Sequence, residues 1–199
     1  MNFKKHREIS RQTWHTNDTS WEQRLQHACL GLIDETGELS SCLKKQIGYN
    51  QKIDLVNMKE ELGDKIYFLH RLLDESEFTE KGKNPHISLD YLLREINPFV
   101  RTPFESICQL SYDMSVLVVQ VSYRLRDSDL PKPEILVENS DVIRVLTSII
   151  QLIGHYEFTL SDVLESNINK LKARYGKKMK FSEEKAINRD IAKERKSLS

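Results

Sequence analysis

The stretch "WEQRLQHACLGLIDETGELSSCLKK", residues 21–45, predicts one long amphipathic helix. Its apolar side chains recur at spacings of three and four, the period at which residues share one face of an α-helix. They are Leu25, Ala28, Cys29, Leu32, Ile33, Leu39, Cys42 and Leu43. Asp18, Thr19 and Ser20 supply side-chain oxygens that can cap the first turn, and Gly48 with the polar stretch "GYNQK" (48–52) is expected to end the helix.

The same periodicity continues along the chain and predicts an all-α helical bundle. A second helix is expected at 55–74, with an inner side made of Met58, Leu62, Ile66, Leu69, Leu72 and Leu73. Further helices are expected at about 88–97, 103–126, 140–156 and 159–176. Strand patterns are nearly absent. We therefore expect one all-α domain at 1–176, followed by a charged tail at 177–199 that packs little.

The composition argues against several classes of partner. Lys plus Arg number 30 and Asp plus Glu number 30, so the net charge is zero and no basic field for binding nucleic acid is expected. No apolar run is long enough to span a membrane, and the first residues lack the apolar core of a secretion signal. Three cysteines within apolar helical patterns indicate reduced core residues, which favours a cytoplasmic protein.

A weak internal echo with a period of 79 residues runs through the chain. It places Cys29 on Cys108 and Asp34 on Asp113, and it carries the helix at 55–74 onto another helical stretch. One interpretation is a duplicated helical unit in which only the first copy keeps its acids, so that one chain is a pseudo-dimer. The other interpretation is that all amphipathic helices resemble one another.

Two predicted helices each carry a pair of acids whose members are about one helical turn apart. Glu35 and Glu38 are three residues apart, and Glu61 and Asp64 repeat that spacing on the next helix. If the two helices pack antiparallel, the four carboxylates converge at the edge of an apolar core, where unpaired charges are costly. A hard divalent cation would relieve the repulsion, because Mg²⁺, and also Mn²⁺, binds carboxylate oxygens. The acids therefore predict a metal site, and an exposed acidic face is the alternative.

Two further observations favour a metal site of this kind. Gly37 and Gly63 lie inside the acidic pairs, although glycine within a helix costs about 1 kcal/mol relative to alanine. Such glycines indicate either the close approach of another helix or access for a ligand. A di-iron centre is disfavoured, because none of the six histidines lies three residues after a glutamate, as the Glu-x-x-His motif requires.

These motifs resemble those of the MazG-like branch of the all-α nucleoside triphosphate pyrophosphohydrolases, which also include the dimeric dUTPases. The family pattern E-E-x-x-E, a spacer and E-x-x-D is similar to "DETGE" (34–38), a spacer of 22 residues and "ELGD" (61–64). The resemblance extends to "FKKHREISRQTWH" (3–15) and to "LSDVLESNINKLKARYGKKMKFSEEKAINRD" (160–190). The chain departs from the family pattern at 75–140, which reads as an inserted or degenerate-repeat helical segment.

The resemblance implies Mg²⁺-dependent hydrolysis of a (deoxy)nucleoside triphosphate to the monophosphate and pyrophosphate by a homodimer. By their places in the motif, four residues match the Mg²⁺ ligands: Glu35, Glu38, Glu61 and Asp64. Either Glu35 or Glu38 is expected to accept the proton of the attacking water. Asp34 stands where the family has its first glutamate, and we expect it to point away from the metal.

The last helix supplies the expected phosphate contacts. The resemblance implies that Asn167, Lys170 and Arg174 bind the phosphates, and their spacing of three and seven places them on one helical face. The alternative is a solvated basic stripe. Thr159 or Ser161 is expected to cap this helix.

Trp14 and His15 are candidates for stacking on the nucleobase, as aromatic rings do in other nucleotide sites. The alternative for each is packing inside the protein. The main alternative to an enzyme is a non-catalytic helical module that binds a nucleotide or a protein through the same face. No nucleic acid or membrane partner is expected in either case.

Overall fold

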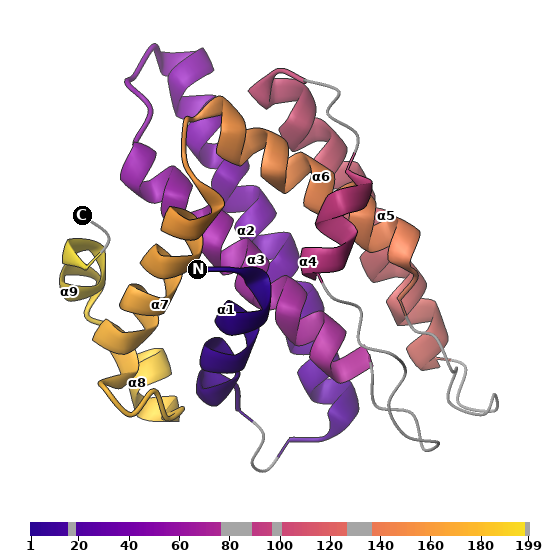
Figure 1. Cartoon of the computed structure of the whole chain (residues 1–199), viewed down its shortest axis with the longest axis vertical. Helices are drawn as coiled ribbons and strands as arrows, with labels where there is room; N and C mark the ends of the chain where they lie inside the picture. Colours follow the sequence, from indigo (N-terminus) through magenta and orange to yellow (C-terminus); the bar gives the residue numbers. More distant parts are fainter. Residues whose placement is uncertain (16–18, 77–88, 97–100, 127–136, 198–199) are drawn as a thin grey trace.

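The computed structural model describes residues 1–15, 19–76, 89–96, 101–126 and 137–197. Within these ranges every regular element is a helix, which confirms the predicted all-α fold (Figure 1). The elements are α1 (Phe3–Ser10), η1 (Arg11–Thr13), α2 (Trp21–Tyr49), α3 (Leu55–Ser76), α4 (Leu89–Leu92), η2 (Leu93–Glu95), α5 (Pro103–Arg126), α6 (Asn139–His155), α7 (Leu160–Tyr175), α8 (Glu183–Ile187) and α9 (Ile191–Lys196). None of the described helices is long and apolar enough to cross a membrane.

Helix α2 begins and ends where the sequence predicts. The Ser20 side chain accepts a hydrogen bond from the amide of Gln23, and the Gln23 side chain accepts one from the amide of Ser20. Asp18 lies outside the described residues. The helix continues through Gly48 to Tyr49, and its C-cap is Asn50, whose φ of 50° is left-handed. Asparagine tolerates this conformation, so Asn50 closes the helix within the stretch 48–52 that was predicted to end it.

Helices α2 and α3 pack antiparallel. At one end, the indole nitrogen of Trp21 donates to the carbonyl of Glu75. At the other end, the side-chain nitrogen Nδ2 of Asn57 lies 2.9 Å from Sγ of Cys42. The antiparallel pairing that the acidic motifs require is therefore present, and it sets the acidic turn of α2 against the acidic turn of α3.

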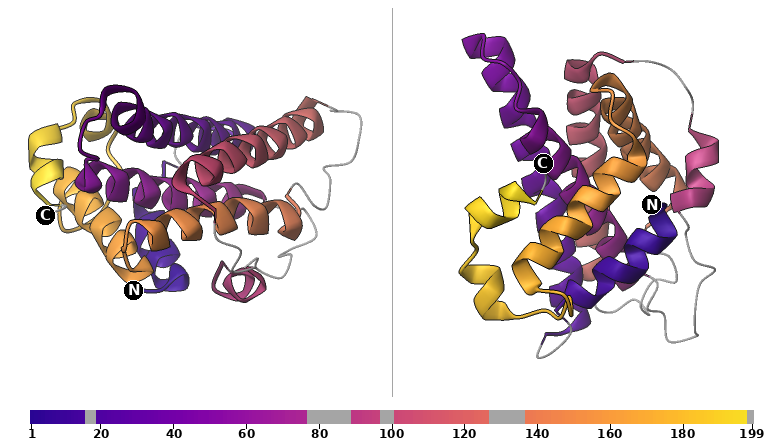
Figure 2. Two further views of the ribbon diagram at one scale, coloured as in Figure 1. Left: turned by 90° about the horizontal axis from the view of Figure 1, so that it is seen from above. Right: turned by 60° about the vertical axis from the view of Figure 1, so that its left-hand side comes forward.

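The core is built around α3. All six apolar side chains that were predicted to face inward on this helix are fully buried: Met58, Leu62, Ile66, Leu69, Leu72 and Leu73. Burying one side chain of this size stabilises the fold by about 1.5–3 kcal/mol. Helices α2 and α7 pack against α3, α5 packs against α2 and α6, and α1 contacts α7 and α3 (Figures 1 and 2). Helix α3 is thus the central element of the bundle.

Two residues that were predicted to face the core are exposed. Ile33 is 47% exposed, because it lies one position round α2 from the fully buried Leu32. Cys108 is exposed on α5, whereas Cys29 and Cys42 are buried free thiols. Both exposed residues lie at the border of an apolar face, where helical period alone does not decide burial.

The segment at 75–140 contributes α4 and α5, and parts of it lie outside the described residues. Helix α5 packs against both α2 and α6, so it forms part of the main bundle. The two aspartates that the 79-residue echo relates differ in burial, since Asp34 is exposed and Asp113 is 3% exposed. The duplicated unit stays a prediction.

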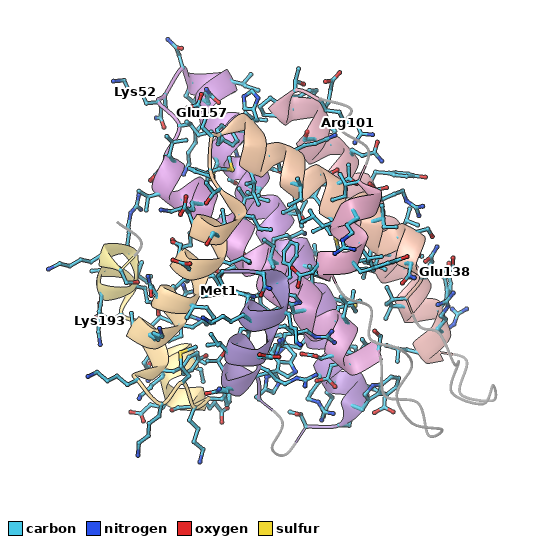
Figure 3. All side chains as sticks on the ribbon, in the orientation of Figure 1. Met1, Lys52, Arg101, Glu138, Glu157 and Lys193 are labelled. Carbon is cyan, nitrogen blue, oxygen red and sulfur yellow. The ribbon has the colours of Figure 1, made fainter. Side chains whose placement is uncertain are left out.

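The charged tail is mostly exposed, but two of its described side chains, Met179 and Glu194, are buried against the bundle. Helix α9 lies against α7, and its Glu194 is only 2% exposed (Figure 2). Glu194 accepts hydrogen bonds from Nε and Nη2 of Arg174 at 2.8 and 2.7 Å. The neighbouring Lys193 is exposed (Figure 3). One buried carboxylate in a highly charged stretch creates no apolar period, so no sequence pattern indicated this contact.

The two glycines of the acidic motifs have different surroundings. A Cβ atom on Gly63 would lie 3.0 Å from Cβ of Asn167 and 3.3 Å from the carbonyl oxygen of Val163, both on α7. A Cβ atom on Gly37 would meet nothing within 4 Å. Gly63 therefore marks a close approach of α7 to α3, whereas Gly37 borders open space.

We expect Gly37→Ala to raise the free energy of unfolding by about 0.5–1 kcal/mol, because alanine is the better helix former. Gly63→Ala should lower it, because α7 must move away from α3. Urea unfolding followed by the far-UV helical signal measures both. Stabilisation by both substitutions would contradict the close α3–α7 contact.

Candidate metal centre

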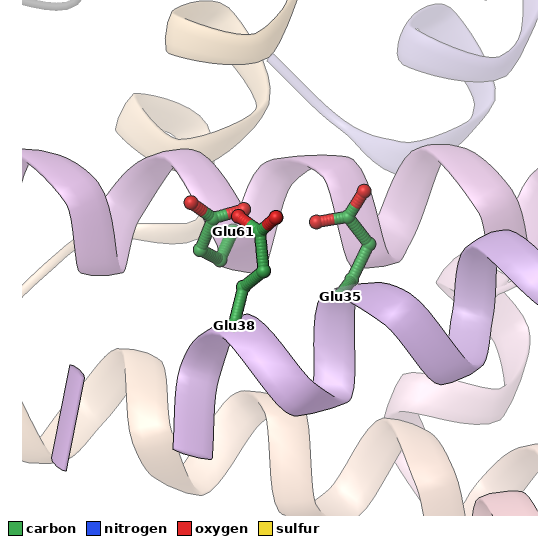
Figure 4. Close-up of side chains that lie close together, drawn as sticks. All are labelled: Glu35, Glu38 and Glu61. Carbon is green, nitrogen blue, oxygen red and sulfur yellow. The ribbon is translucent and has the colours of Figure 1, made fainter. Parts of the chain in front are cut away.

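Three of the predicted metal ligands meet between α2 and α3. Glu35 and Glu38 project from α2 and Glu61 projects from α3, and carboxylate oxygens of the three lie within 4.8 Å of one another (Figure 4). The spacing of three places the first two on one helical face, and the antiparallel packing brings the third opposite them. Glu35 and Glu61 are 9% and 4% exposed, whereas Glu38 is exposed. This three-glutamate cluster is buried on one side and open on the other.

Asp64, the fourth predicted ligand, is held by α7. Its Oδ1 accepts a hydrogen bond from Nδ2 of Asn167 at 2.6 Å, and its Oδ2 pairs with the ammonium group of Lys170. Asp34 is exposed, in agreement with the expectation that it points away from the cluster. The structure thus divides the predicted set of four into three clustered glutamates and one aspartate that α7 already neutralises.

Burial and mutual repulsion favour the protonated form of the cluster. Burial, followed by the charge of Asp64, raises the pKa of Glu35 from 4.5 to about 8. The pKa of Glu61 is also raised, by burial and then by its hydrogen bond and repulsion with Glu35. Without a cation, Glu35 and Glu61 therefore retain a proton between them at neutral pH. A divalent cation that replaces the proton would stabilise the same groups as carboxylates.

Lys170 joins α7 to α3 beside the cluster. It is 2% exposed, and its ammonium group forms ion pairs with Asp64 and, at 2.6 Å, with Glu60. Burial alone would lower the pKa of Lys170, but these two carboxylates outweigh burial and raise it. Sequence analysis had not singled out Glu60; its place directly before Glu61 was the available indication. Lys170 thus keeps a positive charge beside the acids.

Asn167 is oriented by a histidine that sequence analysis had missed. Nε2 of His6, on α1, lies 2.9 Å from Oδ1 of Asn167. Burial lowers the pKa of His6 to about 4, so the ring is neutral at pH 7 and its Nε2–H donates to the amide oxygen. The amide nitrogen of Asn167 then faces Asp64. His6 lies in the stretch 3–15 that carried the resemblance, but no spacing marked it.

Besides Lys170, a second lysine is buried near the acids, between α2 and α3, and sequence analysis had missed it. Lys65 is fully buried, and its ammonium group donates to the carbonyl of Leu32 and the hydroxyl of Thr36. Burial lowers its pKa to about 7, and the charge of Glu35 opposes that shift. Lys65 therefore ties the acidic turn of α2 to α3. Its position directly after Asp64 was the available indication.

Arg174, the third predicted phosphate contact, is engaged by the tail. Its guanidinium group binds Glu194, whose carboxylate also accepts a hydrogen bond from Nη2 of Arg189 at 3.0 Å. Asn167 and Lys170, by contrast, point at α3 and contact Asp64. The structure therefore brings two of the three predicted phosphate contacts to the acids, and the third to Glu194. Helix α7 itself is capped by Thr159, one of the two predicted caps.

The aromatic candidates divide into one packing residue and one partly accessible residue. Trp14 is 6% exposed, its Nε1 donates to Glu75 at 2.8 Å, and its ring stacks on His27 with centroids 4.8 Å apart. These contacts favour the packing interpretation of Trp14. His15 is half-buried, and its ring lies 4.7 Å from that of His27 and 5.4 Å from that of Phe181. A base contact by His15 stays a prediction.

Comparison with known proteins assigns the chain to no family. No family model, curated protein or solved structure matches it. The resemblance to the pyrophosphohydrolases therefore rests on the chain's own residues, chiefly the acidic turns of α2 and α3 and the polar face of α7 beside them.

The raised pKa values predict how stability depends on pH in the absence of metal. Glu35 binds a proton more tightly in the folded than in the unfolded state, so its contribution to stability is complete below about pH 4.5 and is lost as the pH rises through about 8. Between pH 5 and pH 8 the unfolding free energy of the wild type should fall. We expect it to fall less in Glu35→Gln, by on the order of 2 kcal/mol.

Urea titrations in a chelating buffer at the two pH values measure this difference. Asp34→Asn removes an exposed acid one residue away and should leave the pH dependence unchanged. The same pH dependence in Glu35→Gln and in the wild type would contradict the raised pKa of Glu35.

Proposed function

We propose that this protein hydrolyses a (deoxy)nucleoside triphosphate to the monophosphate and pyrophosphate, with Mg²⁺ or Mn²⁺ held by Glu35, Glu38 and Glu61. The observation that supports this most is the meeting of these three carboxyl groups at the α2–α3 interface. A donor set made of carboxylate oxygens suits a hard divalent cation. The exposure of Glu38 leaves one side of the cluster open to a substrate.

The chain's own groups account for the chemical requirements of the reaction. A bound cation would supply neutralisation of the phosphate oxygens at the α–β bond. Glu35 or Glu38 would accept the proton of the attacking water. Glu38 is exposed and reachable by water from solvent, whereas Glu35 is buried, so the two candidates differ in their access to the attacking water.

The polar face of α7 supports phosphate binding. The Lys170 ammonium group and the Asn167 amide already bind an anionic partner, the carboxylate of Asp64. The same donors can bind phosphate oxygens, and lysine supplies positive charge to phosphate without requiring one geometry. We propose that Asp64 joins the cation site when a triphosphate takes its place on Asn167 and Lys170.

Several properties of the resembled family complete the proposal. We expect a homodimer that acts on a small-molecule substrate in the cytoplasm, without a nucleic acid or membrane partner. The zero net charge supports the expectation about nucleic acid, because such binding depends on a basic surface.

A non-catalytic module that binds a nucleotide or a protein is the second candidate function. The observation that favours it is that the two α7 cations expected to bind phosphate already have carboxylate partners, Asp64 for Lys170 and Glu194 for Arg174. These ion pairs neutralise Lys170 and Arg174 without a substrate. Measurement of turnover separates the two candidates.

Pyrophosphate release from a panel of canonical and modified (d)NTPs, with Mg²⁺ or Mn²⁺, tests the enzyme directly. We expect release from at least one of them, and a decrease in kcat of roughly 100-fold or more for Glu38→Gln and for Asp64→Asn. Asp34→Asn is the matched control and should keep its activity, because Asp34 is exposed outside the cluster. Metal binding without release from any substrate would contradict the enzyme and favour the binding module.

The contact of Arg174 with Glu194 predicts a separate effect. Glu194→Gln should weaken the hold on Arg174 and lower KM for the triphosphate, because the guanidinium group becomes available to phosphate. It should also lower the free energy of unfolding by about 1–3 kcal/mol, because Arg174 loses a buried partner. Glu183→Gln, at an exposed acid of α8, is the control for both measurements. Unchanged KM in Glu194→Gln would show that Arg174 takes no part in substrate binding.

A further inference from the structure

A cavity of about 420 Å³ lies between α1, α3 and the start of α4. Phe3 and Leu89 form apolar parts of its wall, and His70 of α3 lines it as well. None of the three clustered glutamates is among its described lining residues. Its volume falls within the range of small-molecule sites, about 300–1,000 Å³.

The described lining of this cavity carries more positive than negative charge. Lys4, Arg7 and Arg11 line it, and Glu8 is the one acid among the described lining residues. These four side chains come from α1 and the turn that follows it. Long basic side chains around a concave, partly apolar surface favour an anionic ligand.

Arg71, which follows the lining residue His70 on α3, adds a further positive charge close to that ring. Arg7, Arg11 and Arg71 all form ion pairs with Asp74. Arg71 is fully buried, and its Nε and Nη1 make no hydrogen bond with any described residue. Three guanidinium groups share this one carboxylate, and the buried one, Arg71, strengthens the preference for an anion nearby.

His70 offers an unused hydrogen-bonding group at the cavity wall. It is 1% exposed, and neither of its ring nitrogens has a hydrogen-bond partner among the described residues. Burial is the main cause that lowers its pKa well below 6.5, and the positive charge of Arg71 adds to it, so the ring is neutral and has one N–H donor. A buried donor without a partner is costly, and a ligand oxygen would satisfy it.

We propose that this cavity binds a small amphipathic anion, with an alkyl or aromatic body against Phe3 and Leu89. Its carboxylate or phosphate head lies among Lys4, Arg11 and the His70 ring. The apolar wall supplies the contact for the body, and the cationic side chains supply charge-assisted hydrogen bonds for the head. The site does not depend on the proposed hydrolase activity.

Isothermal titration calorimetry with three ligands of equal chain length tests this binding site. We expect decanoate or decyl phosphate, or both, to bind at least roughly tenfold more tightly than decyltrimethylammonium, because the two anions match the charge of the cavity and the cation does not. The two anions distinguish a carboxylate from a phosphate head. Equal affinity for the cation and the anions, or no binding of either anion, would overturn the proposal.

Lys4→Glu and Lys5→Glu form a matched pair that locates the binding. Both lysines are exposed on α1, but of the two it is Lys4 that lines the cavity. We expect Lys4→Glu to weaken anion binding roughly tenfold and Lys5→Glu to change it less than about twofold. His70→Phe keeps a ring beside Phe3 and removes the nitrogens, so it should weaken the binding of the anions and not that of decanol. Equal effects of the two lysine substitutions would place the anion elsewhere and overturn the proposal.

Discussion

Acidic side chains of α2 and α3 are buried where the two helices pack, and α7 makes its polar contacts beside them. Glu35 and Glu61 come from different helices, yet both are nearly inaccessible and lie within reach of Glu38. Such a cluster is unfavourable as free carboxylates and requires either protons or a cation. Because the two helices also carry much of the core, this electrostatic requirement is built into the centre of the fold and is not a property of a loop.

A second layer of contacts fixes the cluster in relation to α7 and α1. His6 orients Asn167, Asn167 binds Asp64, and Lys170 pairs with both Asp64 and Glu60. The close approach at Gly63 allows α7 to lie near enough to make these bonds. The same layer pairs the Lys170 ammonium group with carboxylates of α3 beside the three-glutamate cluster.

Helical geometry explains why part of this site could be predicted. The period of apolar residues fixes the inner face of α3, and a spacing of three puts Glu35 beside Glu38 whatever surrounds them. The contact of His6 with Asn167 joins residues 161 positions apart, and no local pattern encodes such a pairing. Glu194 was missed for a related reason, since its burial depends on Arg174 and not on an apolar face. The sequence identifies Trp14 as an aromatic candidate, but it does not decide whether the ring is buried or accessible, because either environment suits a tryptophan.

Anomalous diffraction from crystals grown with Mn²⁺ tests the proposed cation site, because it locates the cation without requiring that the substrate be known. We expect a manganese peak about 2.1 Å from carboxylate oxygens of Glu35, Glu38 and Glu61, and a strongly reduced peak in Glu61→Gln crystals. A wild-type structure at saturating Mn²⁺ with no peak at these three residues would contradict it.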